Sequence, residues 1–192
     1  MLIASGFAEG RTGSSVFEPA MQAERTPGGY IISGSKKPCS LSASMDLLTA
    51  TVLVPTGNGP VRGGIALVAA DSPGGVTVRP FWKAGVLAAS ESDEVVLDEV
   101  FVPEALVVAD VDGVSMSEHE MTGFLWFGML ITAAYLGASC RLVEMLLTKR
   151  GADAEAVACA AGELEASYAA IDGVARRFDA GERGAELSAH LL

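Results

Sequence analysis

Alternating apolar and acidic residues over residues 91–108 predict one long strand after which the pattern of the chain changes. The apolar positions are Val95, Leu97, Val100 and Val102. The acidic residues between them indicate one wet face, and the shift of the alternation at Asp98 and Glu99 predicts a break in the strand. Pro103 should end it, because proline cannot donate a hydrogen bond to a continuing sheet. We expect this strand to close a β domain.

Short strand patterns separated by Gly and Pro turns fill the chain before this strand. The turn at residues 27–29, Pro-Gly-Gly, predicts a hairpin that joins residues 21–24 to residues 30–33. Further strands are predicted at residues 47–54, 64–70 and 76–82, whereas residues 2–15 have the small-residue pattern of a loop. Because no long helix intervenes, an antiparallel barrel or sandwich is favoured over a parallel sheet.

Two long helices are predicted after about residue 114. The first should span residues 117–149 and end at Gly151, and the second should begin after Asp153, a good N-cap. The second helix carries apolar residues at alternating spacings of four and three, which is the pattern of a helix packed in a bundle. These positions are Val157, Ala161, Leu164, Tyr168, Ile171, Ala175 and Phe178. A third helix should begin near Glu182.

These patterns predict the α+β class. We expect residues 1–113 to form an antiparallel β-barrel or sandwich domain and residues 114–192 to form a partial up-down helical bundle. Two helices and the start of a third leave an apolar stripe with too few partners. We therefore expect either that another chain covers this stripe or that the sequence is a fragment.

Composition and charge limit the classes of partner that this chain is expected to bind. The net charge of −11 and a pI near 4.5 argue against nucleic acid or an anionic membrane as the main partner.

Residues 121–140 carry no charge over a length that could cross a bilayer, but their glycines and their continuation into an amphipathic stretch favour a helix buried inside a bundle. Three dissimilar cysteines, two histidines and no signal peptide indicate a cytoplasmic protein with reduced thiols and without a metal site.

Four segments, in order, resemble motifs of the acyl-CoA dehydrogenase family. FAEGRTGSS at residues 7–15 is similar to (L/F)TEPxxGSD, and GYIISGSKKPCS at residues 29–40 is similar to GYxLxGxKxWIT. DEVVLDEVFVP at residues 93–103 is similar to the strand that precedes (D/N)VxVP, and YLGAS at residues 135–139 is similar to LGxA. The resemblance implies the middle β domain and the first half of the C-terminal helical domain of a family that uses FAD to desaturate acyl thioesters.

The resemblance also implies a flavin-binding surface. Matched by motif position, its residues are Phe7, Ala8, Gly13, Ser14, Pro38, Cys39, Ser40 and Arg150. The Gly13-Ser14 turn would face the diphosphate, and residues 38–40 would flank the flavin ring near N5. Ala8 and Pro38 stand where the family has Thr and Trp, so we expect weakened FAD binding. From the residues alone, the turn at 10–15 is more often a plain surface turn, and only the resemblance favours a diphosphate loop. A small buried residue is favoured over a reactive thiol for Cys39.

The implied reaction is FAD-dependent oxidation of the CH–CH bond of an acyl thioester. The family's catalytic carboxylate lies beyond residue 192, so no catalytic residue is assigned and the site is expected to be incomplete in this chain alone. Two alternatives stay open: a non-catalytic partner subunit of a dehydrogenase-like complex, or a flavin-dependent monooxygenase of the same fold. We expect a homo- or hetero-oligomer formed through the helical domain, with neither nucleic acid nor membrane as partner.

Overall fold

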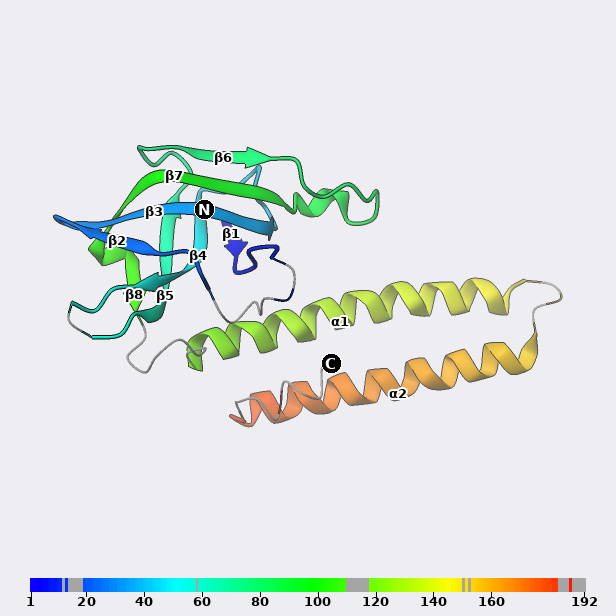
Figure 1. Cartoon of the computed structure of the whole chain (residues 1–192). Coiled ribbons are helices and arrows are strands. Elements are labelled where there is room, and N and C mark those ends of the chain that lie inside the picture. The colour runs from blue at the N-terminus through cyan, green and yellow to red at the C-terminus, as the bar shows by residue number, and fades with distance from the viewer. Residues whose placement is uncertain are drawn as a thin grey trace. The chain divides into compact units, whose positions relative to one another are not determined.

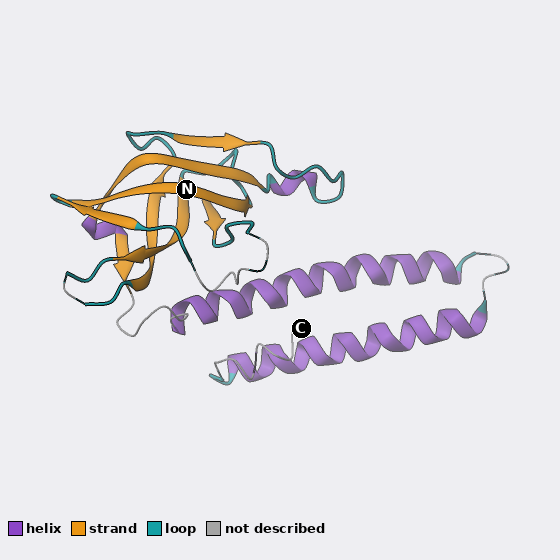
Figure 2. Ribbon diagram, in the orientation of Figure 1, coloured by secondary structure: helices purple, strands orange, loops and turns teal. Residues whose placement is uncertain are grey.

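The structure is a computed structural model that describes residues 1–11, 13, 19–57, 59–109, 118–149, 151, 153–182 and 187. The chain divides into two compact units, Met1–Ser115 and Met116–Leu192 (Figure 1). Strands make up the first unit and two long helices make up the second (Figure 2). The predicted α+β class is confirmed.

The first unit consists of two four-stranded sheets. The first sheet has the order β1 (Ile3–Gly6), β4 (Leu47–Val54), β5 (Arg62–Ala69) and β8 (Val107–Ala109). The second sheet has the order β2 (Ala23–Thr26), β3 (Gly29–Cys39), β7 (Asp93–Pro103) and β6 (Val76–Arg79). Over the described residues both sheets remain open at their edges. The first unit is thus a sandwich, and the barrel alternative is not realised.

One hydrophobic core is shared by the two sheets. Alternate residues of β4 point into it, and those of β7 do so on each side of the break near Glu99, because successive side chains of a strand face opposite sides. Its fully buried members include Ile32, Leu48, Ala50, Val52, Val95 and Val100. Burial of this apolar surface drives the packing of the two sheets.

The N-terminal segment differs from its predicted loop. Ile3–Gly6 forms β1, which pairs in parallel with β4. Gly6 permits this approach, because a Cβ there would lie 2.7 Å from the carbonyl oxygen of Thr49. Four residues are too few to show a strand period in the sequence, and the strand exists because β4 offers it an edge. The parallel β1–β4 pair departs from the predicted antiparallel pairing.

The predicted break in β7 is confirmed. Leu97 pairs with Gly34 and Val100 pairs with Ile32, so two residues of β7 face one residue of β3 in a bulge. Glu99 adopts a positive φ of 50° there, and its N–H donates to Ser33 Oγ at 3.0 Å. The strand ends at Pro103, as predicted.

The strand predicted at residues 76–82 is shorter in the structure. β6 ends at Arg79, and Phe81 and Trp82 lie in the loop that follows. Both rings are partly exposed, at 38% for Phe81 and 40% for Trp82. Asp93 Oδ1 accepts hydrogen bonds from the N–H groups of both residues, at 2.7 and 3.1 Å, and these bonds replace the pairing of a strand.

The second unit contains α1 (Glu118–Leu147) and α2 (Ala154–Asp179), close to the predicted spans. Asp153 caps α2 as predicted, accepting from the N–H groups of Glu155 and Ala156 at 3.0 and 3.4 Å. The helices share a small core that consists of Leu125, Met129, Val174, Phe178 and Leu187. Of the predicted third helix, which was to begin near Glu182, only Glu182 and Leu187 lie among the described residues.

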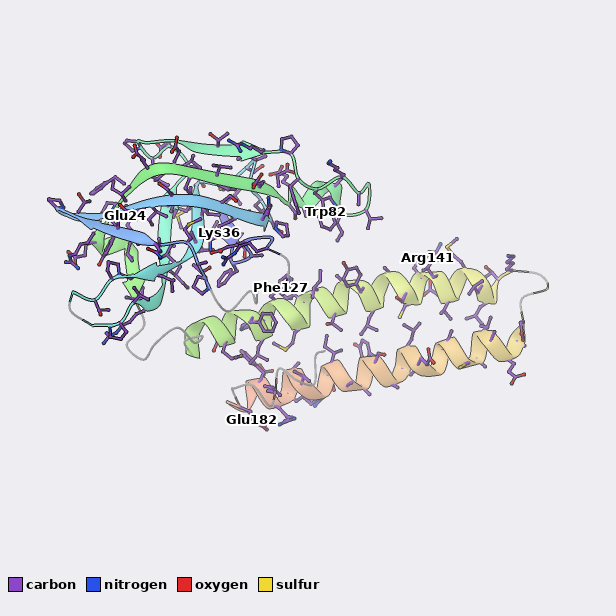
Figure 3. All side chains as sticks on the ribbon, in the orientation of Figure 1. Glu24, Lys36, Trp82, Phe127, Arg141 and Glu182 are labelled. Carbon is purple, nitrogen blue, oxygen red and sulfur yellow. The ribbon has the colours of Figure 1, made fainter. Side chains whose placement is uncertain are left out.

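Among the described residues of the second unit, much of the apolar surface of α1 is exposed. Phe127, labelled in Figure 3, is 60% exposed. Leu130 is 62% exposed and Leu147 67%. Among the described residues, the segment Met121–Leu147 is long and apolar enough to cross a membrane by length and composition, a test that core helices of soluble proteins also pass. Only 11% of its apolar window is buried, so the predicted burial inside a bundle is not achieved by this chain alone.

Candidate functional site

The first two motif segments lie side by side in the structure. The N–H of Lys37 donates to the carbonyl of Ala8 at 2.8 Å, and the N–H of Ser5 donates to the carbonyl of Ser40 at 3.4 Å. Residues 7–9 therefore run along the end of β3, although about thirty residues separate them in sequence. We call the surface formed by residues 7–11 and 38–40 the motif surface.

The structure brings five of the predicted site residues together on the motif surface. These are Phe7, Ala8, Pro38, Cys39 and Ser40. Gly13 is described, with a positive φ of 76° and open space where a Cβ would stand. Ser14 and Arg150 lie outside the described residues, so their predicted roles stay predictions.

Exposure alternates along residues 38–40. Pro38 and Ser40 are exposed, whereas Cys39 is fully buried in the sandwich core. Burial raises the pKa of the Cys39 thiol to about 11, so it remains protonated at neutral pH. Only the backbone of Cys39 is therefore available to a molecule bound on the motif surface, and Pro38 and Ser40 supply the side chains.

A chain of three serine hydroxyls determines what Ser40 can offer. Ser40 Oγ lies 2.9 Å from Ser92 Oγ, and Ser92 Oγ lies 2.7 Å from Ser90 Oγ. Ser90 Oγ donates its proton to the carbonyl of Leu87 at 2.7 Å, because a carbonyl only accepts. Ser92 must then donate to Ser90, and Ser40 must donate to Ser92. Ser40 is left with lone pairs for any further partner and acts there as an acceptor.

A buried ion pair joins Glu9, the last residue of the segment 7–9, to Lys36 of β3. The ammonium of Lys36, whose side chain is 0% exposed, donates to Glu9 Oε1 at 2.8 Å and to Thr51 Oγ1 at 2.9 Å (Figure 3). Thr51 Oγ1 in turn donates to the carbonyl of Phe7 at 3.2 Å. Sequence reasoning missed this pair. The signal was present, because Glu9 and Lys36 stand at the E and K positions of the two matched motifs.

Glu9 also ties the segment to the chain that follows it. Its Oε1 accepts from the N–H groups of Ala20 and Met21 at 3.0 and 3.1 Å, and its Oε2 lies 2.7 Å from the guanidinium of Arg11. Four groups therefore converge on one carboxylate that is nearly removed from water. Such convergence is typical of a structural anchor.

The pKa values of Glu9 and Lys36 are both lowered, which favours the charged form of Glu9 and the neutral form of Lys36. Burial raises the pKa of Glu9, but hydrogen bonds from Lys36 and from the amides of Ala20 and Met21 outweigh burial, so the pKa lies below its usual value of 4.5. Burial lowers the pKa of Lys36, and the Glu9 carboxylate offsets part of that shift. The pair is ionised at neutral pH, because the Glu9 carboxylate accepts hydrogen bonds from Lys36 and from the amides of Ala20 and Met21.

The third motif segment adjoins the motif surface through Lys37. Its ammonium lies 2.8 Å from Glu94 Oε1, at the start of β7, and 5.7 Å from the centre of the Phe81 ring. The hydrogen bond from Lys37 is the main cause of the lowered pKa of Glu94. All three β-domain motifs thus meet at one end of the sandwich.

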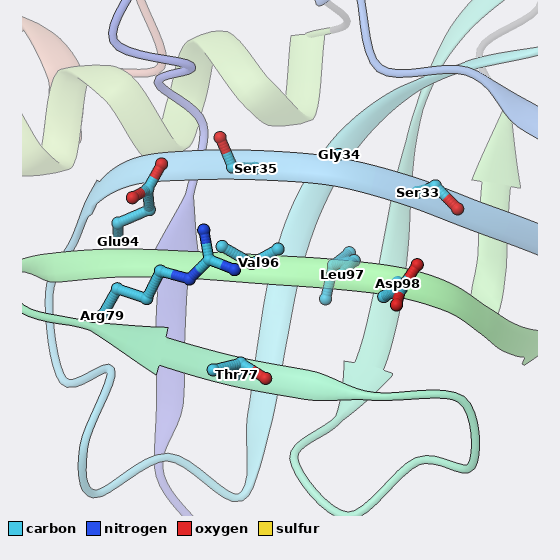
Figure 4. Close-up of a pocket in the computed structure, with 9 residues that line it drawn as sticks. All are labelled: Ser33, Gly34, Ser35, Thr77, Arg79, Glu94, Val96, Leu97 and Asp98. Carbon is cyan, nitrogen blue, oxygen red and sulfur yellow. The ribbon is translucent and has the colours of Figure 1, made fainter.

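An open depression lies elsewhere, on the faces of β3, β6 and β7 (Figure 4). It has a volume of about 590 Å³, and its polar lining includes Ser33, Ser35, Thr77, Arg79, Glu94 and Asp98. Its lining includes none of the residues predicted to bind flavin, although Glu94, the partner of Lys37, is part of it. Over the described part of the chain, no three His, Cys, Asp or Glu side chains are grouped so that they could hold a metal ion.

No protein-family model matches this chain. Isobutylamine N-hydroxylase from Streptomyces viridifaciens is 41% identical over 194 aligned positions, which cover 100% of this chain and 51% of that protein. The sequence of this chain thus spans about half the length of that curated relative.

Solved structures show the same fold. Glutaryl-CoA dehydrogenase from Mycobacterium smegmatis superposes with a TM-score of 0.79 at 21% identity, over 96% of this chain and 49% of that one. PigA with FAD and proline superposes with a TM-score of 0.76 at 19% identity, over 98% of this chain and 51% of that one. This chain corresponds to about half of each.

Proposed function

We propose that this chain, which has the acyl-CoA dehydrogenase-like fold that its motifs predicted, is the flavin-binding part of a flavin-dependent monooxygenase that hydroxylates the nitrogen of a small amine. The observation that carries this proposal is the 41% identity to isobutylamine N-hydroxylase, which extends over the whole chain. The chain spans about half the length of that relative.

The motif surface fits the ring system of FAD. Phe7 is half-buried and Pro38 exposed, and both offer apolar contact to a flat ring. Ser40 offers lone pairs at the end of its serine chain, next to them. At Gly13 the backbone turns through a positive φ with open space beside it, which lets it approach a diphosphate closely. Bound flavin would supply the redox chemistry.

Ser40 is the residue with a defined chemical task in this proposal. Because its proton is donated to Ser92, its lone pairs suit a ring N–H, and reduced flavin carries such an N–H at N5 whereas oxidised flavin does not. A monooxygenase must hold reduced flavin until dioxygen arrives. Overall, an amine, dioxygen and reduced flavin would give a hydroxylamine, water and oxidised flavin.

Acyl thioester dehydrogenation is the alternative that the motifs imply. The likeness to glutaryl-CoA dehydrogenase supports the fold alone at 21% identity. Ala8 and Pro38 lack the hydroxyl and the aromatic ring of the dehydrogenase motifs. A non-catalytic partner subunit is the other alternative, and it predicts no flavin binding by the motif surface.

Titration of the purified chain with oxidised and with reduced FAD, followed by flavin absorbance and fluorescence, tests the proposal. We expect binding of both forms, tighter for the reduced one, and a loss of about tenfold in affinity for reduced FAD in Ser40→Ala. Ser44→Ala is the matched control, because Ser44 contacts Glu91 outside the serine chain. No binding of either form at high micromolar FAD would refute flavin binding by this chain.

Turnover separates the two reaction classes. The chain is incubated either with reduced FAD, air and isobutylamine or with oxidised FAD and an acyl-CoA, so that each reaction has the form of flavin that it consumes. N-hydroxylation predicts a hydroxylamine product detected by mass spectrometry. Formation of an enoyl thioester in place of the hydroxylamine would favour the dehydrogenase alternative.

A further inference from the structure

We propose that Glu9 and Lys36 act together as positioning residues for the motif surface, a role that the matched motifs do not assign to them. We call this ion pair the buried clip. It holds residues 7–9 in the shape in which they would face the flavin, so this inference rests on the proposed function. Neither residue is proposed to touch substrate.

Stability alone does not account for the buried clip. The Lys36 side chain is 0% exposed and that of Glu9 is 10% exposed, so both charges have lost most of their water. Apolar side chains of similar volume would fill this space without that penalty, and buried ion pairs replaced in this way are often no less stable. What an apolar pair cannot do is direct hydrogen bonds to particular backbone atoms.

Two contacts made through the buried clip and one neighbouring backbone hydrogen bond hold three consecutive residues. Thr51, which accepts from Lys36, donates to the carbonyl of Phe7 at 3.2 Å. The N–H of Lys37 donates to the carbonyl of Ala8 at 2.8 Å, and Glu9 receives Lys36 directly at 2.8 Å. Successive residues of the segment are thus set by groups of β3 and β4, the two strands that anchor opposite sheets of the sandwich.

The same carboxylate also holds the chain where it returns to the sandwich. Its Oε1 accepts from the amides of Ala20 and Met21, which lead into β2. The Glu9 side chain therefore holds residues 7–9, which follow β1, and residues 20–21, which lead into β2. Removing Glu9 should release both, whereas the sandwich core of apolar residues would remain.

The first test needs no flavin. Hydrogen exchange of the Ala20, Met21 and Lys37 amides is followed in the wild-type chain and in the double variant Glu9→Ala/Lys36→Met, which leaves no unpaired buried charge. We expect exchange of these amides to be about tenfold faster or more in the double variant. The control Arg25→Met removes an exposed ion pair with Glu104 and should leave the three amides protected. Unchanged exchange of these amides in the double variant would refute the proposal that the buried clip positions the segment.

The second test separates positioning from stability. Glu9→Ala alone leaves Lys36 buried without its counter-charge, so its urea midpoint should fall well below wild type, and the double variant should recover most of the loss. We expect the affinity for FAD to stay about tenfold weaker in both. If affinity recovers together with stability, the clip only supports folding and the inference is wrong.

A comparison of two double variants tests whether the side-chain oxygen of residue 9, rather than its charge, supports FAD binding. Glu9→Gln/Lys36→Met also lacks charge but keeps an oxygen that accepts from Ala20 and Met21, so it should regain part of the FAD affinity. Equal affinity in the Gln and Ala double variants would contradict the positioning role. If the wild-type chain binds no FAD, the proposed function fails and the cofactor role of the clip fails with it, while the amide exchange still decides whether the clip holds the segment.

Discussion

Cys39 differs from the other two cysteines in burial, and this difference predicts its reactivity. Its thiol is 0% exposed with a pKa raised to about 11, whereas Cys140 and Cys159 are exposed. A thiol reagent at pH 8 should modify two of the three cysteines quickly and Cys39 only after unfolding, because the thiolate is the reactive form. Mass spectrometry of the modified peptides measures this. Rapid modification of Cys39 in the native chain would contradict the described packing of β3.

Ser92 controls the direction of the Ser40 hydroxyl, and its removal should change which form of flavin is preferred. In Ser92→Ala the proton of Ser40 loses its acceptor and becomes available to a ring nitrogen, which oxidised flavin offers at N5. We expect the ratio of affinities for reduced and oxidised FAD to fall several-fold. Spectroscopic titration of both forms measures the ratio. Ser44→Ala should leave it unchanged, and an unchanged ratio in Ser92→Ala would refute the assigned direction.

The pKa of Glu9 predicts how the first unit responds to acid. Because the folded-state pKa lies below the usual 4.5, the ionised carboxylate stabilises the fold above pH 4.5, and this stabilisation is lost as pH falls through the lower folded-state value. Urea midpoints measured from pH 7 down to pH 3 should therefore fall most steeply below pH 4.5. Glu9→Gln/Lys36→Met, in which neither residue titrates, should show a shallower fall. An equal slope in both proteins would exclude Glu9 as a main cause.

At the scale of elements, the start of α2 depends on one side chain. Asp153 accepts from the N–H groups of Glu155 and Ala156, which have no carbonyl partner within the helix. Asp153→Ala should therefore destabilise the helical unit by about 1 kcal/mol. The loss is read from the helical circular dichroism signal on heating. Asp153→Asn is the matched variant that keeps an acceptor, and it should melt close to wild type.

Strand β1 and the loop after β6 show how neighbouring elements override local patterns. The segment Ile3–Gly6 is short and rich in small residues, yet it is a strand because the edge of β4 accepts it. Phe81 and Trp82 continue the apolar pattern of β6 but leave the sheet, because Pro80 has no N–H to donate to it and Asp93 binds the two amides that follow. Local periodicity fails where the partner that decides the structure is distant in sequence.

At the scale of the whole molecule, the helical unit exposes an apolar surface that a monomer in water would not be expected to keep. Leu130, Leu142 and Leu147 on α1 are 62%, 62% and 67% exposed. We expect the chain by itself to self-associate in analytical ultracentrifugation and to bind a hydrophobic dye. Leu130→Glu/Leu142→Glu should reduce both signals. A monomer with little dye binding would contradict the expectation that α1 needs further partners.

The sequence by itself determined most of the elements and their order. The spans of β4 and β7, the bulge at Glu99 and the Asp153 cap follow from local residue patterns, since each depends on neighbours a few residues away. The predictions for β3 and α2 were partly wrong: β3 extends to Cys39, beyond the predicted residues 30–33, and Tyr168 of the predicted α2 stripe is 64% exposed. The order of the motifs also pointed to the acyl-CoA dehydrogenase-like fold. These features need no knowledge of distant contacts.

Only the tertiary structure decided which residues of the candidate site act together. It placed residues 7–9 against β3, turned Cys39 inward while Pro38 and Ser40 face outward, and joined Glu9 to Lys36 beneath them. It also linked Ser40 to Ser92, so that the direction of one proton depends on a residue 52 positions away in the sequence. The physical reason is that hydrogen bonds and ion pairs are short-ranged, and only the folded chain brings their partners within about 3 Å.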